Sequence, residues 1–238
     1  MGNGEKWLLE KSKQAIDDGA RCERAGLCGI GIRGIVPAMD IDAVAAQLRS
    51  HGFATAQQSL PPELLARLDG ACHDSVEFPF VPSGTGRVGA RQPNASIRGD
   101  VILWLDGAKE LDRAYLGLME GLRVALNEQL YLGLADYQGH YAIYESGTHY
   151  DRHVDSLAGK RNRLLSSVVY LNDGWAQADG GELLLYRADA PEVIARILPQ
   201  PGLLVLFLSE EFPHEVLSAT RARHSIAGWF SGRPRDPS

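Results

Sequence analysis

The hydrophobic period of this sequence changes once, near Tyr137, and that change constrains the fold more than any other feature. Before it, apolar residues recur at the spacing of amphipathic helices. After it, short runs rich in Val, Leu, Tyr and Phe alternate with turn-forming residues, over 138–145, 164–171, 182–187, 193–198, 202–208, 214–218 and 223–230. Such strands are typical of a sandwich, barrel or jelly roll. We therefore predict an α+β fold with a mainly β core, in which N-terminal helices support one sheet.

Three helices are expected in the first half of the chain. One opens after Asp40, with the apolar stripe Ile41, Val44, Ala45 and Leu48. A second, with Leu64, Leu65 and Leu68 facing inward, has prolines in its first turn and Ser59 as its expected N-cap. The longest spans about 108–131, with Leu111, Tyr115, Leu118, Leu122 and Leu126 on one stripe.

One domain is expected over 39–232, with helical support over 39–131, a jelly-roll core over 137–231 and a polar tail over 233–238. Residues 1–38 are Gly-rich and lack a sustained period. Met39 is an alternative start, which would make that segment a dispensable or mis-annotated extension; the sequence leaves both interpretations open. Residues 82–99 are rich in turn formers, and a loop of that length is typical of a lid or binding loop.

Composition excludes several classes of protein. The formal net charge of −6 argues against a nucleic-acid binder, which needs a strong basic excess. The three cysteines form no C-x-x-C pair, which argues against a disulfide framework and favours a reducing compartment. No apolar run approaches the length of a membrane span, and the first residues lack a signal-peptide core. We expect a soluble, cytoplasmic protein that contacts neither nucleic acid nor membrane.

The His153-Val154-Asp155 motif is the first indication of chemistry. On an extended backbone, residues i and i+2 point to the same face, so one imidazole and one carboxylate converge. His214, at the head of a predicted strand, is the expected third ligand. Two histidines and one carboxylate on one face of an octahedral ion leave three open positions, as is typical of non-haem Fe(II) oxygenases.

Arg223 supplies the complementary charge. If strands 214–218 and 223–230 form a hairpin about Ala219-Thr220 with an even loop, Arg223 shares the face of His214 on the adjacent strand. Formal charges of +2 for Fe²⁺, −1 for Asp155 and +1 for Arg223 sum to +2. A dicarboxylate such as 2-oxoglutarate, which carries −2, neutralises this site by chelating iron at one end and pairing with the guanidinium at the other.

Several motifs resemble those of 2-oxoglutarate and Fe(II)-dependent prolyl hydroxylases, in particular the hypoxia-inducible-factor prolyl hydroxylases and their bacterial relatives. They occur in the family's order between about 40 and 232. The resembling segments are IRGDVILWLDG over 97–107, YESGTHYDRHVD over 144–155, YLNDGW over 170–175, GGEL over 180–183, PHEV over 213–216, and Arg223 through Trp229.

The resemblance implies a double-stranded β-helix (a jelly-roll, cupin-like fold) supported by N-terminal helices. It also implies a role for each matching residue. His153, Asp155 and His214 would hold iron, and Arg223 and the Tyr170 hydroxyl would bind the distal carboxylate of 2-oxoglutarate. Tyr144 resembles a tyrosine that contacts the same co-substrate, although the loop after it is one residue shorter than in the family. On the substrate side, Trp229 would line the site, and Arg98 and Asp100 would order the lid or contact the peptide.

The function implied is that of a dioxygenase of the peptidyl-prolyl 4-hydroxylase type. It would use O₂, convert 2-oxoglutarate to succinate and CO₂, and take ascorbate as a candidate reductant. The expected partner is a protein with a target proline, with elongation factor Tu as the candidate by resemblance to bacterial members, and a monomer is expected.

Three alternatives remain open at this point. The same scaffold could hydroxylate another residue or a small molecule. The same three ligands would also suit a zinc-dependent hydrolase, which has no need of Arg223 or Tyr170. A non-catalytic cupin-like binding module would not convert 2-oxoglutarate under any condition.

Overall fold

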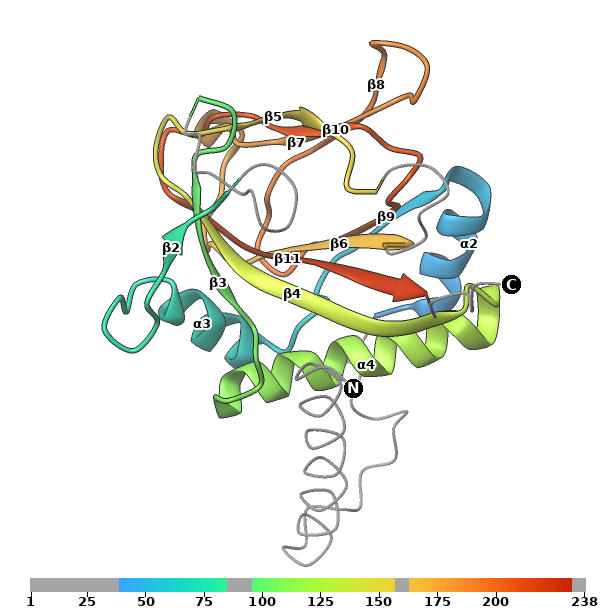
Figure 1. Cartoon of the computed structure of the whole chain (residues 1–238), viewed down its shortest axis with the longest axis horizontal. Coiled ribbons are helices and arrows are strands. Elements are labelled where there is room, and N and C mark those ends of the chain that lie inside the picture. Colours follow the sequence, from blue (N-terminus) through green and yellow to red (C-terminus); the bar gives the residue numbers. More distant parts are fainter. Residues whose placement is uncertain (1–38, 85–95, 157–162, 233–238) are drawn as a thin grey trace, which may run out of the picture. The chain divides into compact units, whose positions relative to one another are not determined.

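The computed structural model describes residues 39–84, 96–156 and 163–232 (Figure 1). The expectations for 1–38, for the tail over 233–238 and for the middle of the lid loop, 85–95, concern residues outside these ranges. In chain order the elements are α2 (Ile41–His51), β1 (Phe53–Ala56), α3 (Pro62–Ala71), β2 (Val81–Pro82), β3 (Asp100–Trp104), α4 (Glu110–Leu130), β4 (Leu134–Tyr144), β5 (Tyr150–His153), β6 (Leu165–Tyr170), the 3₁₀ turn η2 (Gln177–Asp179), β7 (Leu183–Tyr186), β8 (Val193–Ile197), β9 (Leu204–Leu208), β10 (His214–Val216) and β11 (Arg223–Gly232).

The strands form two antiparallel sheets. The large sheet has the order β1-β9-β6-β11-β4-β3-β2, and the small sheet has the order β5-β10-β7-β8. From β4 onward the chain passes repeatedly between them, so strands that follow one another in sequence mostly lie in different sheets. Figure 1 shows the small sheet facing one side of the large sheet, while α3 and α4 lie against the other side.

Two apolar layers hold this arrangement together. One lies between the helices and the large sheet, where the predicted stripe of α4 is buried against residues such as Ile226 and Phe230 of β11. The other lies between the sheets and includes Tyr170 of the large sheet and Leu185 of the small one. The expected α+β class, with a mainly β core supported by N-terminal helices, is confirmed.

The helix predictions hold except for one cap. Asp40 caps α2, because its carboxylate accepts a hydrogen bond from the Ala43 amide at 3.0 Å. The predicted capping of α3 by Ser59 is wrong. The helix begins after Pro61 without a side-chain cap, and the Ser59 hydroxyl instead donates to the Gly202 carbonyl at 2.8 Å. That serine therefore fastens the loop before α3 to the turn before β9.

The expectation that helices come first and strands after is only partly correct. β1, β2 and β3 lie within the helical half of the chain and occupy both edges of the large sheet. These strands span only two to five residues, too few for an alternating pattern to stand out from the neighbouring helical stripes.

The predicted hairpin between 214–218 and 223–230 is wrong. β10 pairs with β5 and β7 in the small sheet, whereas β11 pairs with β4 and β6 in the large one. The residues around Ala219 therefore carry the chain across from one sheet to the other instead of turning it within a sheet.

Within the described ranges, no helix has both the length and the apolar character needed to span a membrane.

Candidate metal centre

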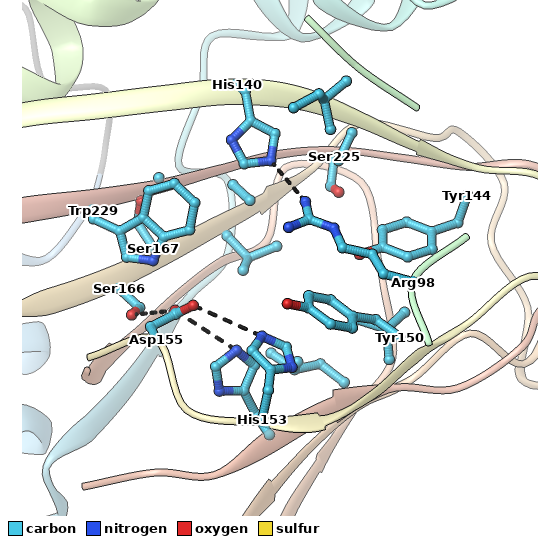
Figure 2. A pocket seen from close by; sticks show the side chains of 18 of the residues that line it. Arg98, His140, Tyr144, Tyr150, His153, Asp155, Ser166, Ser167, Ser225 and Trp229 are labelled. Atoms are coloured by element: carbon cyan, nitrogen blue, oxygen red, sulfur yellow. Dashed lines mark hydrogen bonds and ion pairs between the residues drawn. The ribbon is translucent and has the colours of Figure 1, made fainter. Parts of the chain in front are cut away.

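A cavity between the two sheets gathers most of the side chains that the sequence singled out (Figure 2). Those lining it are Arg98, Tyr144, His153, Asp155, His214, Arg223 and Trp229. Tyr170 is fully buried beside Arg223. Asp100 is also buried, and its carboxylate binds Arg98.

Three potential metal ligands meet at the small-sheet side of the cavity. His153 ends β5, and β10 pairs His214 directly opposite it. Asp155 follows two residues after His153, so its carboxylate lies between the two imidazoles. His153 Nε2 is 3.8 Å from Asp155 Oδ1, and His214 Nε2 is 3.7 Å from Asp155 Oδ2. These separations are too long for hydrogen bonds, and they suit three ligands of one ion.

In the neutral form of each histidine, the hydrogen bond at Nδ1 leaves the Nε2 lone pair facing the carboxylate. His153 Nδ1 lies 2.9 Å from the Asp151 carbonyl oxygen, and His214 Nδ1 lies 3.0 Å from the Phe212 carbonyl oxygen. Because a carbonyl only accepts, each Nδ1 carries the proton, and the Nε2 lone pair is left free to bind a metal.

Electrostatics keep His153 and Asp155 in their metal-binding forms at neutral pH. Burial, followed by the neighbouring His214, lowers the pKa of His153 to about 3, so its imidazole is neutral. For Asp155 burial alone would raise the pKa, but the two histidines and the Ser166 hydroxyl outweigh it and hold the pKa below the usual value. A neutral imidazole and an ionised carboxylate are the forms in which these groups bind a divalent cation.

Ser166 helps to orient the Asp155 carboxylate. Its hydroxyl donates to Asp155 Oδ2 at 2.7 Å, as Figure 2 shows, and lies 2.8 Å from the hydroxyl of Ser209. Both serines are buried, so this contact does not compete with solvent. The sequence reasoning missed Ser166, although its place on a predicted strand facing the cavity was a usable signal.

We expect Ser166→Ala to weaken Fe(II) binding by about 10–100-fold, the usual cost of removing a group that orients a metal ligand. Isothermal titration under anaerobic conditions measures this change. Ser167→Ala is the matched control, because Ser167 is equally buried but its hydroxyl contacts Tyr137. Equal affinity in the two variants would show that Ser166 has no part in orienting Asp155.

Arg223 lies across the cavity from the metal ligands, on the facing sheet. The hairpin was expected to turn Arg223 toward His214. Instead, Arg223 reaches the cavity from β11 in the large sheet, where its side chain points inward. Its guanidinium carbon lies 4.8 Å from the ring centre of Tyr170 and 5.3 Å from that of Tyr144. Among the described residues no carboxylate pairs with it, and its contact with a side-chain oxygen is to Ser225 at 3.5 Å.

Arg223 Nε and the Tyr170 hydroxyl are buried and have no hydrogen-bond partner among the described residues. An unpaired buried polar group costs about 1–3 kcal/mol, so this end of the cavity favours a ligand that fills both positions. A carboxylate, which accepts only and carries negative charge, does so. The residues present therefore fit a dicarboxylate co-substrate that also reaches the metal ligands.

Arg98, which is half-buried, forms an ion pair at the rim of the cavity with the buried Asp100. Arg98 Nε and Nη2 donate to the two carboxylate oxygens of Asp100 at 2.6 and 2.8 Å, and the Ser83 hydroxyl donates to the same carboxylate. The Arg98 guanidinium also lies 4.7 Å from the ring centre of Tyr150. Through Ser83 and Arg98, the Asp100 carboxylate thus links β3 to the described ends of the loop over 82–99.

His140 lines the same cavity and was not singled out by the sequence reasoning. Its ring lies 4.9 Å from that of Trp104 and 5.4 Å from that of Trp229, and Arg98 Nη2 donates to its Nε2 at 3.4 Å. Burial, followed by the positive charge of Arg98, lowers its pKa to about 3. Strand alternation was the available signal, since His140 and Tyr144 lie four residues apart on one face of β4.

Comparison with known proteins gives a consistent result. The family model described as the 2OG-Fe(II) oxygenase superfamily matches residues 139–231. A crystal structure of a Pseudomonas putida prolyl-4-hydroxylase superposes with a TM-score of 0.72 and 38% identity, over 82% of this chain and the whole of that one. A Trichoplax adhaerens prolyl hydroxylase, solved with a peptide of hypoxia inducible factor, gives a TM-score of 0.68 and 25% identity, over 80% of this chain and 88% of that one.

Two curated relatives match smaller parts of the chain. A hypoxia-inducible factor prolyl hydroxylase of Caenorhabditis elegans is 33% identical over 144 residues, which make up 56% of this chain and 20% of the relative. A prolyl 3-hydroxylase of Xenopus laevis is 34% identical over 88 residues, 34% of this chain and 17% of the relative. The matches thus span about a fifth of the curated relatives' length. The solved structures confirm the expected double-stranded β-helix.

Proposed function

This chain belongs to the 2OG-Fe(II) oxygenase superfamily, in its prolyl hydroxylase-like group, and from that premise we propose that it hydroxylates a prolyl residue in a protein substrate. In this proposal, His153, Asp155 and His214 hold Fe(II), and Arg223 with Tyr170 holds the distal carboxylate of 2-oxoglutarate. The observation that carries the proposal is the pairing, across one cavity, of a His-Asp-His cluster with a buried guanidinium that has no carboxylate partner among the described residues.

When bound, iron and 2-oxoglutarate together supply the oxidising chemistry that inserts one atom of O₂ into a C–H bond and releases succinate and CO₂. The protein's residues position these components. Ser166 holds the Asp155 carboxylate toward the two imidazoles. Arg223 and the Tyr170 hydroxyl fix the far end of the co-substrate, and Tyr144 covers the guanidinium from the side of β4.

The substrate side of the cavity is aromatic. Trp104 and Trp229 flank His140, and the Arg98–Asp100 pair holds the adjoining rim in place. Indole faces suit the apolar, rigid ring of proline, and their bulk excludes water from the reacting centre. We assign Trp229, Arg98 and Asp100 to substrate binding and to ordering of the neighbouring lid.

Elongation factor Tu is the proposed target, following the resemblance to bacterial members of the family. The proposal includes action in the cytoplasm, as a monomer, with ascorbate as reductant. A cytoplasmic location is supported by the cysteine pattern and by Cys72, which is buried as a free thiol.

Incubation of the iron-loaded protein with 2-oxoglutarate, ascorbate and either cell extract or purified elongation factor Tu tests this function. We expect mass spectrometry to find a prolyl residue heavier by one oxygen atom, with succinate formed in equal amount. The His153→Ala variant should produce neither. Modification of a residue other than proline would contradict the prolyl assignment, and the absence of any 2-oxoglutarate turnover would contradict the oxygenase assignment.

A further inference from the structure

A second cluster of potential metal ligands lies on the opposite face of β11. We propose that Asp69, His73 and His224 bind a second divalent cation, Zn²⁺, outside the cavity between the sheets. Their nearest ligand atoms all lie within 4.8 Å of one another, as in the cluster of His153 and Asp155. The donor set is again two imidazoles and one carboxylate.

Two elements bring these side chains together. Asp69 lies in the last turns of α3, and His73 follows four residues later, just past the end of the helix, so the two share a face. His224 comes from β11, where its neighbour Arg223 points into the cavity and His224 therefore points away from it, toward α3. The site would join the last turn of a supporting helix to a central strand of the large sheet.

The distances within this cluster suit three ligands of one ion, two of which share a hydrogen bond while no metal is bound. His73 Nε2 lies 3.9 Å from Asp69 Oδ2, a spacing that suits two ligands of one ion. His224 Nδ1 lies 2.7 Å from Asp69 Oδ1, which is a hydrogen bond, and the two imidazole rings are 4.7 Å apart, edge to face. Zn²⁺ would take the place of the proton on His224 Nδ1, and the neutral ring would then carry its proton on Nε2, with no change of oxidation state.

Exposure and charge favour entry of a cation. The side chain of His224 is 4% exposed, that of Asp69 23% and that of His73 67%. His224 would therefore bind the cation from the buried side, and the cation would enter from solvent beside His73. Within the described part of the chain, no lysine or arginine forms an ion pair with Asp69, so no side chain with a permanent positive charge competes with a cation for this carboxylate. Imidazole and carboxylate ligands with one position left to water are a common zinc environment.

Zinc titration of the full-length protein tests the proposal through stoichiometry. We expect the wild type to bind about two equivalents of Zn²⁺, one at each His-Asp-His cluster. His73→Ala and Asp69→Asn should each lower this to about one, as should His153→Ala, while the His153→Ala/His73→Ala double variant should bind none. His51→Ala is the matched control, because His51 is an exposed helical histidine outside both clusters.

Thermal unfolding gives a second readout that does not depend on turnover. In the His153→Ala background, saturating Zn²⁺ should raise Tm by about 5 °C, because a ligand that binds only the folded state stabilises it. Adding His73→Ala should abolish that rise, whereas adding His51→Ala should leave it. Since His73 is exposed, its replacement is not expected to impair folding.

The inference is independent of the proposed function, and their failures look different. A wild type that binds one equivalent, lost in His153→Ala, overturns the second site and leaves the oxygenase site intact. A second equivalent that survives both His73→Ala and Asp69→Asn places that metal elsewhere and also overturns the proposal.

Discussion

Replacing His214 with alanine is expected to reduce 2-oxoglutarate-dependent turnover by about 10³-fold or more, equivalent to at least about 4 kcal/mol of lost stabilisation. The reason is geometric. His214 Nε2 faces Asp155 across the proposed iron position, and no other described imidazole besides His153 lies close enough to replace it. Succinate release measures turnover, and anaerobic Fe(II) titration measures the accompanying loss of metal.

The fold should survive this substitution. The hydrogen bond that the His214 ring makes through Nδ1 goes to Phe212, two residues away in the same segment, and Nε2 faces the cavity. Circular dichroism and thermal unfolding check this expectation, with His51→Ala as the control for loss of a histidine. A His214→Ala protein that keeps both its iron and its turnover would remove the basis for the proposed centre.

Replacing Arg223 with methionine is expected to have opposite effects on binding and stability. Affinity for 2-oxoglutarate should fall by at least about 10²-fold, because the charged partner of the distal carboxylate is lost. Without co-substrate, however, the variant should be more stable than the wild type by about 1–3 kcal/mol. Arg223 is only 2% exposed and pairs with no carboxylate of the described residues, and the substitution replaces its charge with an apolar chain.

Thermal unfolding with and without 2-oxoglutarate measures both effects at once. The wild type should gain Tm on addition of the co-substrate, and Arg223→Met should start higher and gain nothing. Arg221→Met is the matched control, because Arg221 is exposed two residues earlier and pairs with Asp179. A zinc hydrolase using the same ligands would keep its activity in Arg223→Met, so full activity in this variant would favour that alternative.

The metal ligands could be predicted from the sequence because the signal is local. His153 and Asp155 are two residues apart, and the geometry of an extended backbone is enough to place them together. The structure retains that convergence even though β5 ends at His153. His214 could be added because it opens a strand of the mainly β half, and strands of such folds surround a common interior.

Arg223 shows the limit of such reasoning. The alternation of side chains along a strand predicts which residues share a face. It does not predict which sheet the strand joins, because the strands that pair with it are distant in sequence. The expected hairpin was wrong, yet Arg223 reaches the cavity because the two sheets face each other. His140 and Ser166 were missed for a related reason. The role of His140 depends on Trp104 of β3, and that of Ser166 on Ser209 in the segment after β9.

The two faces of the ten-residue strand β11 have different roles. Arg223, Ser225 and Trp229 face the cavity, while Ile226 and Phe230 face the helices. Substitutions among the residues that face the cavity can alter ligand preference without disturbing the core. Substitutions among those that face the helices can alter the stability of the fold without changing the residues of the site. An insertion or deletion of a single residue inside the strand would exchange the two sets. New specificities can therefore evolve on this fold by point substitutions in β11, but not by insertions or deletions within that strand.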